Sequence, residues 1–153
     1  MSKTLPVAAI KNGTVIDHIP AGFGLVIIRL LRLDLMMNQV TAGLKLKSKK
    51  LGKKDLIKIE GRKLTEKECQ EIAIFSTGST VNIIKDFQIE KKIKARLPDT
   101  IEKILICPNI HCITRFEPIP STFFVEEHKH DVLLTCKYCE KTFDRDEIQE
   151  YQT

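Results

Sequence analysis

The sequence lacks several features that mark common protein classes. It contains no tryptophan, and aromatic residues make up only 6% of the chain. No apolar stretch reaches the roughly eighteen residues that a transmembrane helix needs. The N-terminal residues show no apolar segment typical of a secretory signal. We therefore expect a protein with no membrane partner, located in the cytoplasm, where thiols stay reduced.

Signatures of catalysis are also missing. The segment Gly22-Phe23-Gly24 lacks the lysine and the hydroxyl residue of a phosphate-binding P-loop. No candidate nucleophile stands with a general base, and no pair of carboxylates is placed for acid–base chemistry. The sequence therefore predicts a protein that is not an enzyme and has no catalytic residues.

Charge is distributed unevenly along the chain. Residues 1–100 carry 19 basic and 10 acidic residues, a net charge of +9, whereas residues 101–153 carry 6 and 10, a net charge of −4. This change and the Leu97-Pro98-Asp99 segment predict two domains, 1–97 and 98–153. The basic domain could attract a nucleotide, a nucleic acid or an acidic surface, or it could present an ordinary solvated face.

Hydrophobic periodicity in the first domain predicts alternating strands and helices. We expect strands over 14–18, 39–47, 55–60, 79–85 and 87–94, helices over 23–33 and 65–75, and a basic loop over 48–54. Thr65 and Glu68 have the spacing of a capping box. This order is that of a ferredoxin-like βαββαβ unit, an antiparallel sheet with two helices on one face, followed by one more strand.

The second domain has a different sequence pattern. Short strand candidates, 101–106, 122–127 and 132–135, alternate with turns rich in proline and cysteine. Residues 144–151 are predicted to form a short helical turn or to fray. The whole chain is therefore predicted to be α+β, with an N-terminal ferredoxin-like domain and a small all-β C-terminal domain.

Four cysteines in the second domain form a metal-binding pattern. A C-x4-C pair and a C-x2-C pair are separated by 23 residues, and each pair is close enough for two thiolates to meet one ion. A domain of about fifty residues has little core, so a metal would stabilise it. The pattern predicts a zinc-ribbon-like domain with one structural Zn²⁺ per chain, bound by Cys107, Cys112, Cys136 and Cys139.

Other readings of these residues are open at this point. An iron–sulfur cluster also uses four thiolates, although the spacing matches neither ferredoxin pattern. A redox dithiol in the second pair would leave the first pair unexplained. His111 could replace a thiolate, His128 and His130 suit a surface loop or strand end, and Cys69 suits a buried thiol in the second helix.

The first domain is poorly suited to stacking RNA bases. RNA-binding sheets of this kind carry aromatic side chains on their central strands, and the strands 14–18, 39–47 and 55–60 have none. A carboxylate could instead bind ribose hydroxyls, and lysines and a histidine could bind phosphates. Taken one at a time, each candidate is better interpreted as an ordinary surface residue; they are Asp17, His18, Lys58, Asn82, Lys92 and Lys94.

Several segments together resemble the regulatory chain of aspartate carbamoyltransferase. They are Thr14–Pro20 (TVIDHIP), Gly52–Glu60 (GKKDLIKIE), Thr80–Asn82 (TVN), Cys107–Cys112 (CPNIHC) and Cys136–Cys139 (CKYC). The resemblance extends from about residue 7 to residue 143. It implies a non-catalytic subunit that regulates pyrimidine nucleotide biosynthesis.

The resemblance also implies partners and site residues. The first domain would bind CTP, ATP and possibly UTP and would pair with a second regulatory chain. The zinc domain would dock on the catalytic chain. Backbone groups of Ile10 and Ile89 would meet the base, Asp17 and Lys58 the ribose, and His18 and Lys92 the phosphates; Asn82 and Phe87 would line the pocket, and Lys54 would lie nearby.

Two other functions compete with this one. A zinc-ribbon protein could bind nucleic acid, although the acidic second domain makes nucleic acid an unfavourable partner. The chain could also be an assembly module whose nucleotide site no longer responds.

Overall fold

The computed structural model describes residues 9–129 and 131–151. The chain divides into two compact units, one up to Arg96 and one from Leu97. Each unit is described by itself. Among the described residues, no helix is both long enough and apolar enough to cross a membrane.

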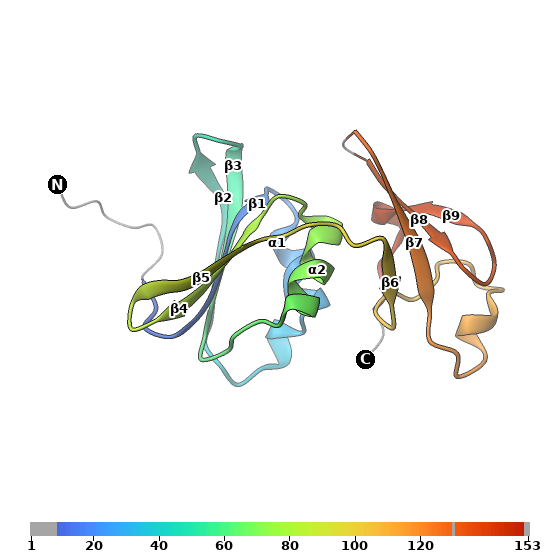
Figure 1. Cartoon of the computed structure of the whole chain (residues 1–153), viewed down its shortest axis with the longest axis horizontal. Helices are drawn as coiled ribbons and strands as arrows, with labels where there is room; N and C mark the ends of the chain where they lie inside the picture. Colours follow the sequence, from blue (N-terminus) through green and yellow to red (C-terminus); the bar gives the residue numbers. More distant parts are fainter. Residues whose placement is uncertain (1–8, 130, 152–153) are drawn as a thin grey trace. The chain divides into compact units, whose positions relative to one another are not determined.

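The N-terminal unit is a five-stranded antiparallel sheet with α1 and α2 on one face (Figure 1). The strands lie in the order β2-β3-β1-β4-β5, so β5 extends the edge next to β4. This arrangement confirms the ferredoxin-like prediction with its additional strand. The elements are β1 (Gly13–Pro20), α1 (Gly24–Leu30), β2 (Val40–Ser48), β3 (Gly52–Glu60), α2 (Glu66–Phe75), β4 (Thr80–Lys85) and β5 (Gln88–Lys94).

The sheet face beneath the helices forms the core. Ile16 on β1 lies opposite Ile57 on β3 and Val81 on β4, and all three are fully buried. Burying each such side chain stabilises the fold by roughly 1.5–3 kcal/mol. Because side chains alternate along a strand, the residues between them point to the opposite face, which no helix of the described residues covers.

The helices agree with prediction except at the end of α1. That helix was expected to reach residue 33, but it ends at Leu30 because Arg32 takes a left-handed conformation, and a 3₁₀ turn, η1 (Leu33–Leu35), follows. The capping box of α2 is confirmed. The Glu68 N–H donates to Thr65 Oγ1 at 3.2 Å, and the Thr65 N–H donates to Glu68 Oε1 at 3.1 Å.

The prediction of a basic loop over 48–54 is wrong in part, because β3 begins at Gly52. The buried carboxylate of Asp55 helps to hold this region. It accepts backbone N–H groups from Gly22 at 3.0 Å, Gly24 at 2.9 Å and Lys45 at 2.9 Å. Asp55 therefore connects the turn before α1 to the irregular middle of β2.

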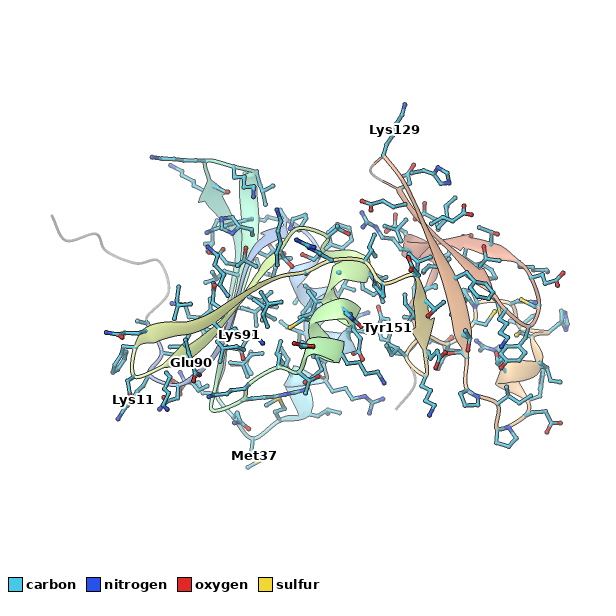
Figure 2. The ribbon with its side chains drawn as sticks, in the orientation of Figure 1. Lys11, Met37, Glu90, Lys91, Lys129 and Tyr151 are labelled. Carbon is cyan, nitrogen blue, oxygen red and sulfur yellow. The ribbon has the colours of Figure 1, made fainter. Side chains whose placement is uncertain are left out.

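The C-terminal unit has a four-stranded antiparallel sheet in the order β6-β7-β8-β9. Its core includes Leu105, Phe123, Val132 and Leu134. The elements are β6 (Thr100–Glu102), η2 (Ile113–Arg115), β7 (Thr122–His128), β8 (Asp131–Cys136), β9 (Thr142–Asp144) and η3 (Arg145–Glu147). Figure 2 labels Lys129 at the tip of the β7–β8 hairpin.

Two details of this unit differ from prediction. The first strand ends at Glu102 rather than residue 106, because Lys103 has a left-handed backbone. Strand β9 was not predicted. The short helical turn expected in the tail is confirmed as η3, after which the chain returns to the domain, where Tyr151 pairs with Leu105.

Candidate functional site

A row of side chains crosses the open face of the N-terminal sheet. Val15 on β1 lies opposite Lys58 on β3 and Asn82 on β4, and Asn82 lies opposite Lys92 on β5. Neighbouring strands are about 4.8 Å apart, and three such spacings separate Lys58 on β3 from Lys92 on β5. The sheet thus collects residues from four separate strands on one surface.

A second row lies beside the first. Asp17 on β1 is opposite Thr80 on β4, which is opposite Lys94 on β5. The Lys54 ammonium forms an ion pair with Asp17 Oδ1 at 2.8 Å. Burial alone would raise the pKa of Asp17, but Lys54 and the His18 backbone N–H outweigh it and hold the pKa below its ordinary value. Asp17 is therefore ionised at neutral pH, among cations.

His18 occupies a β-bulge at the end of this surface. The pairing of β1 with β3 skips between Ile16 and Ile19, and His18 has a φ of 58°. Its N–H donates to Asp17 Oδ1 at 2.7 Å. A left-handed conformation is unfavourable for a residue other than glycine, and bulges often redirect a side chain next to a functional site.

Two buried polar atoms on this surface lack hydrogen-bond partners among the described residues. They are Nδ1 of His18 and Oδ1 of Asn82. Buried polar atoms are rarely left unsatisfied, because each loses its bonds to water without replacement. A polar ligand on the open face would supply the missing partners.

Lys58 is the most buried cation of the surface. Its residue is only 8% exposed, and burial lowers the pKa of its ammonium, while the Asp17 carboxylate partly offsets this effect. Because desolvation disfavours the charged form, an anionic ligand near Lys58 would raise its pKa again. The position favours binding of anions.

The other end of the surface is apolar. Ile10 is buried, whereas Phe87 and Ile89 are exposed, and Ile89 pairs with the buried Ile84. The Phe87 N–H donates to the Lys11 carbonyl at 2.9 Å, which holds the β4–β5 turn against the chain entering β1. A molecule along β1 would meet apolar, then polar, then cationic groups.

Sequence reasoning left out two residues of this surface. Val15 lies in the middle of the first row and Thr80 in the middle of the second. Both fall within segments that carry the family resemblance, but neither has a charged side chain that would mark it as a candidate ligand-binding residue. Only the pairing of the strands reveals their positions.

The four cysteine thiols of the C-terminal unit converge. The Sγ atoms of Cys107 and Cys139 are 3.7 Å apart, those of Cys112 and Cys136 are 3.8 Å apart, and all four lie within 4.8 Å of one another. Sulfurs placed about 2.3 Å from a central ion form a tetrahedron with edges of about 3.8 Å. The thiols therefore fit one tetrahedral metal ion.

Hydrogen-bond donors surround these sulfurs. Burial raises the pKa of Cys107, and the neighbouring thiols add to this effect, although the Asn109 N–H opposes it. Burial also raises the pKa of Cys139, but the Lys141 N–H and the Asn109 side chain outweigh it and bring that pKa to about 7. Donors that stabilise thiolates support metal ligation, because the thiolate is the ligand form.

The remaining histidines and Cys69 lie outside this cluster. His111 is exposed and is not among the converging ligand atoms, and exposed His128 lies 3.2 Å from Glu126. His130 falls outside the described residues. Cys69 is buried in α2 of the other unit.

Both units match family models. Residues 5–96 match the allosteric domain of the aspartate carbamoyltransferase regulatory chain, and residues 99–149 match the metal-binding domain of the same chain. The chain belongs to the aspartate carbamoyltransferase regulatory-chain family. Membership makes it a non-catalytic subunit whose partner is a catalytic chain, and its C-terminal cysteines belong to a metal-binding domain.

Curated relatives carry the same name over almost their full length. The regulatory chain of Chromobacterium violaceum is 49% identical over 150 residues, which cover 98% of this chain and 99% of the relative. That of Aeromonas hydrophila is 48% identical over 146 residues, 95% of each chain. That of Vibrio cholerae is 43% identical over 148 residues, covering 97% of this chain and 96% of the relative.

Proposed function

We propose that the N-terminal unit binds nucleoside triphosphates, namely CTP, ATP and UTP, on its open sheet face. Through this binding the regulatory chain controls carbamoyl transfer by the catalytic chain, and hence pyrimidine nucleotide biosynthesis in the cytoplasm. The C-terminal unit binds one structural Zn²⁺ and docks on the catalytic chain, while two regulatory chains pair through their N-terminal domains.

The observation that carries the nucleotide proposal is the pair of rows on the open face. In this assignment Ile10, Phe87 and Ile89 receive the base at the apolar end, and Asp17 and Lys58 bind the ribose. His18 and Lys92 bind the phosphates. The unsatisfied atoms of His18 and Asn82 support the assignment, because a nucleotide offers donors and acceptors along its whole length.

The zinc proposal rests on the sulfur geometry and on the donor set. Four thiolates fill a tetrahedral shell, which is the arrangement of a closed structural site. Removal of the ion would leave four thiols close together, three of them buried, with nothing to bind them. Because the sulfurs converge only in the folded domain, zinc binding and folding are coupled.

The docking proposal rests on an apolar surface beside the thiols. Ile110 lies between the first two cysteines and is 65% exposed, and Ile113 and Phe116 follow at 48% and 71%. The segment is fastened to the metal site, since Thr114 Oγ1 lies 3.1 Å from Cys112 Sγ and Arg115 Nη1 donates to the Cys107 carbonyl at 2.7 Å. Zinc would thus shape the surface that meets the catalytic chain.

Regulation follows from binding linkage. A nucleotide that binds one state of the assembled enzyme more tightly shifts the enzyme toward that state, and substrate affects nucleotide binding reciprocally. Coupling of this kind is usually about 1–3 kcal/mol, enough for a change of roughly 5- to 150-fold in affinity.

The test uses the regulatory chain assembled with its catalytic chain. Rate is measured against aspartate concentration, with and without each nucleotide. We expect the curve to shift, and Lys58→Gln and Lys92→Gln to abolish the shift without dissociating the complex. Lys67→Gln, an exposed lysine on α2, serves as the control and should respond like the unmodified chain. Unchanged curves at saturating nucleotide would refute the regulatory proposal.

The same experiment separates the alternatives. An assembly module without sensitivity would hold the complex together but show no shift. A nucleic-acid-binding protein would bind oligonucleotides with a steep salt dependence and ignore free CTP.

A further inference from the structure

An open cavity lies on the helix side of the N-terminal sheet, between β5 and the segment that leads into α2. Its volume is about 400 Å³. Its apolar lining comes from Leu64 and Ile83, which are 6% and 5% exposed, and from Ile93, which packs against the core beneath the helices. Small-molecule sites typically have this size and combine an apolar lining with a few polar groups. The cavity is separate from the open face, because it lies on the other side of the sheet.

A β-bulge in β5 brings two opposite charges to this cavity. Ile83 on β4 pairs with Lys91, but the next residue, Ile84, pairs with Ile89. Glu90 is therefore an extra residue in β5. Consecutive residues of a regular strand point to opposite faces, yet Glu90 and Lys91, both labelled in Figure 2, line the same cavity. Bulges often redirect a side chain next to a functional site.

Each of these two charges has a partner at the start of α2 or just before it. The Lys63 ammonium donates to Glu90 Oε2 at 3.0 Å, and the Lys91 ammonium lies 3.6 Å from Glu66 Oε1. All four side chains are well exposed, and exposed ion pairs contribute little to stability. A ligand can therefore replace a partner at small cost. The distance of 3.6 Å exceeds that of a charge-assisted hydrogen bond, so the Lys91 ammonium has donors to offer a ligand.

We propose that this cavity binds an α-amino acid with an apolar side chain, such as leucine. The carboxylate of the ligand meets Lys91, its ammonium meets Glu90, and its side chain covers the apolar lining. The charges of the cavity decide the class of ligand: two lysines and two glutamates line it, so their sum is zero. A zwitterion finds a partner for each of its charges there, whereas a ligand with one charge leaves a cavity group of the other kind without a new partner.

This inference does not rest on the proposed nucleotide site. Asn82 and Lys92 of that site alternate along β4 and β5 with Ile83 and Lys91 of the cavity. The two ligands would therefore contact the same two strands from opposite faces.

The experiment is an NMR titration of the ¹⁵N-labelled full chain with L-leucine. We expect saturable shifts of the backbone amides around Ile83 and Lys91. Two analogues test the charges: 4-methylpentanoate lacks the ammonium of leucine, and 3-methylbutylamine lacks the carboxylate. Each should bind about tenfold more weakly than leucine, as for loss of a hydrogen bond to a charged group. Glycine, which has no apolar side chain, should also bind at least about tenfold more weakly.

A substitution then tests the assignment of the carboxylate. Lys91→Gln should weaken leucine binding about tenfold and should change the binding of 3-methylbutylamine, which has no carboxylate, less than about twofold. Lys67→Gln is the matched control, because Lys67 is an exposed lysine next to Glu66 on α2 and is not part of the cavity lining. It should bind leucine like the unmodified chain. Circular dichroism of each variant confirms that the chain has folded.

Three outcomes would overturn the proposal. Absence of saturable shifts with leucine would remove the site. Equal affinity for leucine and both analogues would reduce the cavity to an apolar surface without selectivity for zwitterions. Equal losses in Lys91→Gln and Lys67→Gln would reduce the effect to net charge. Each of these results leaves the proposed nucleotide function intact, because that function is tested separately through the response to CTP.

Discussion

The two units of this chain are stabilised by different means. The N-terminal unit buries a continuous cluster that includes Ile16, Ile57, Ile59 and Val81 beneath its helices. The C-terminal unit is smaller, and three of its four clustered cysteines are themselves among its buried residues. A short chain segment that cannot bury enough apolar surface needs a further source of stability. One chain can therefore contain both a unit stabilised by its apolar core and a smaller unit stabilised in addition by a metal site.

The largest expected effect is loss of the metal site. Cys136→Ser should unfold the C-terminal unit, because a thiolate ligand is lost from a site on which the fold depends. The N-terminal unit should still show its own unfolding transition. Metal content and circular dichroism during thermal unfolding provide the measurement.

Cys69→Ala is the matched control for this change. It removes a buried thiol from the other unit, so metal content should stay the same while the N-terminal transition shifts. A Cys136→Ser chain that kept both its metal and its full secondary structure would contradict the comparison.

The next effect is expected in the N-terminal core. Ile57 is fully buried between the sheet and the helices, so Ile57→Ala should lower the free energy of unfolding of that unit by about 2–5 kcal/mol. Chemical denaturation followed by circular dichroism measures the loss. Metal content should not change. Simultaneous loss of metal would show that the units are not stabilised independently.

A smaller effect is expected at the start of α2. Thr65→Ala removes the side-chain oxygen that accepts the Glu68 N–H, and loss of such a cap usually costs about 1 kcal/mol. The N-terminal transition should shift accordingly in denaturant titrations. Thr65→Ser keeps the hydroxyl and should behave like the unmodified chain; a similar loss in both variants would point to the methyl group instead.

The smallest effect concerns acid. The folded pKa of Asp17 lies below the ordinary value of 3.8, so its contribution to stability is present above pH 3.8 and is lost as pH falls through the lower folded pKa. Asp17→Asn should remove this part of the acid dependence from the N-terminal transition. If stability falls at acidic pH in the same way in Asp17→Asn as in the unmodified chain, the ion pair between Asp17 and Lys54 contributes nothing to the acid dependence.

Acid should act differently on the C-terminal unit. Metal binding requires deprotonated thiols, so protons compete with the ion. Metal release during acid titration should therefore be the same in Asp17→Asn as in the unmodified chain. One titration thus distinguishes the acid response of the C-terminal unit from that of the N-terminal unit.

Much of the architecture was predictable from local patterns. Alternation of apolar residues predicted all five strands of the first sheet, and the spacing of Thr65 and Glu68 predicted where α2 begins. Cysteine spacing predicted that two turns would meet. The end of α1 at Leu30 and the strand β9 were missed, because the left-handed Arg32 and a three-residue strand leave little trace in composition.

The sequence by itself determined the order of the strands and the two main helices in the N-terminal unit, the residues able to bind a metal and the chemical types available for a nucleotide. Only the tertiary structure decided which of these meet. Lys58, Asn82 and Lys92 are far apart in the chain, and pairing of β3, β1, β4 and β5 places them in one row. A shift of one residue in any pairing would turn a side chain to the other face. The site is therefore a property of strand register, which local sequence patterns do not specify.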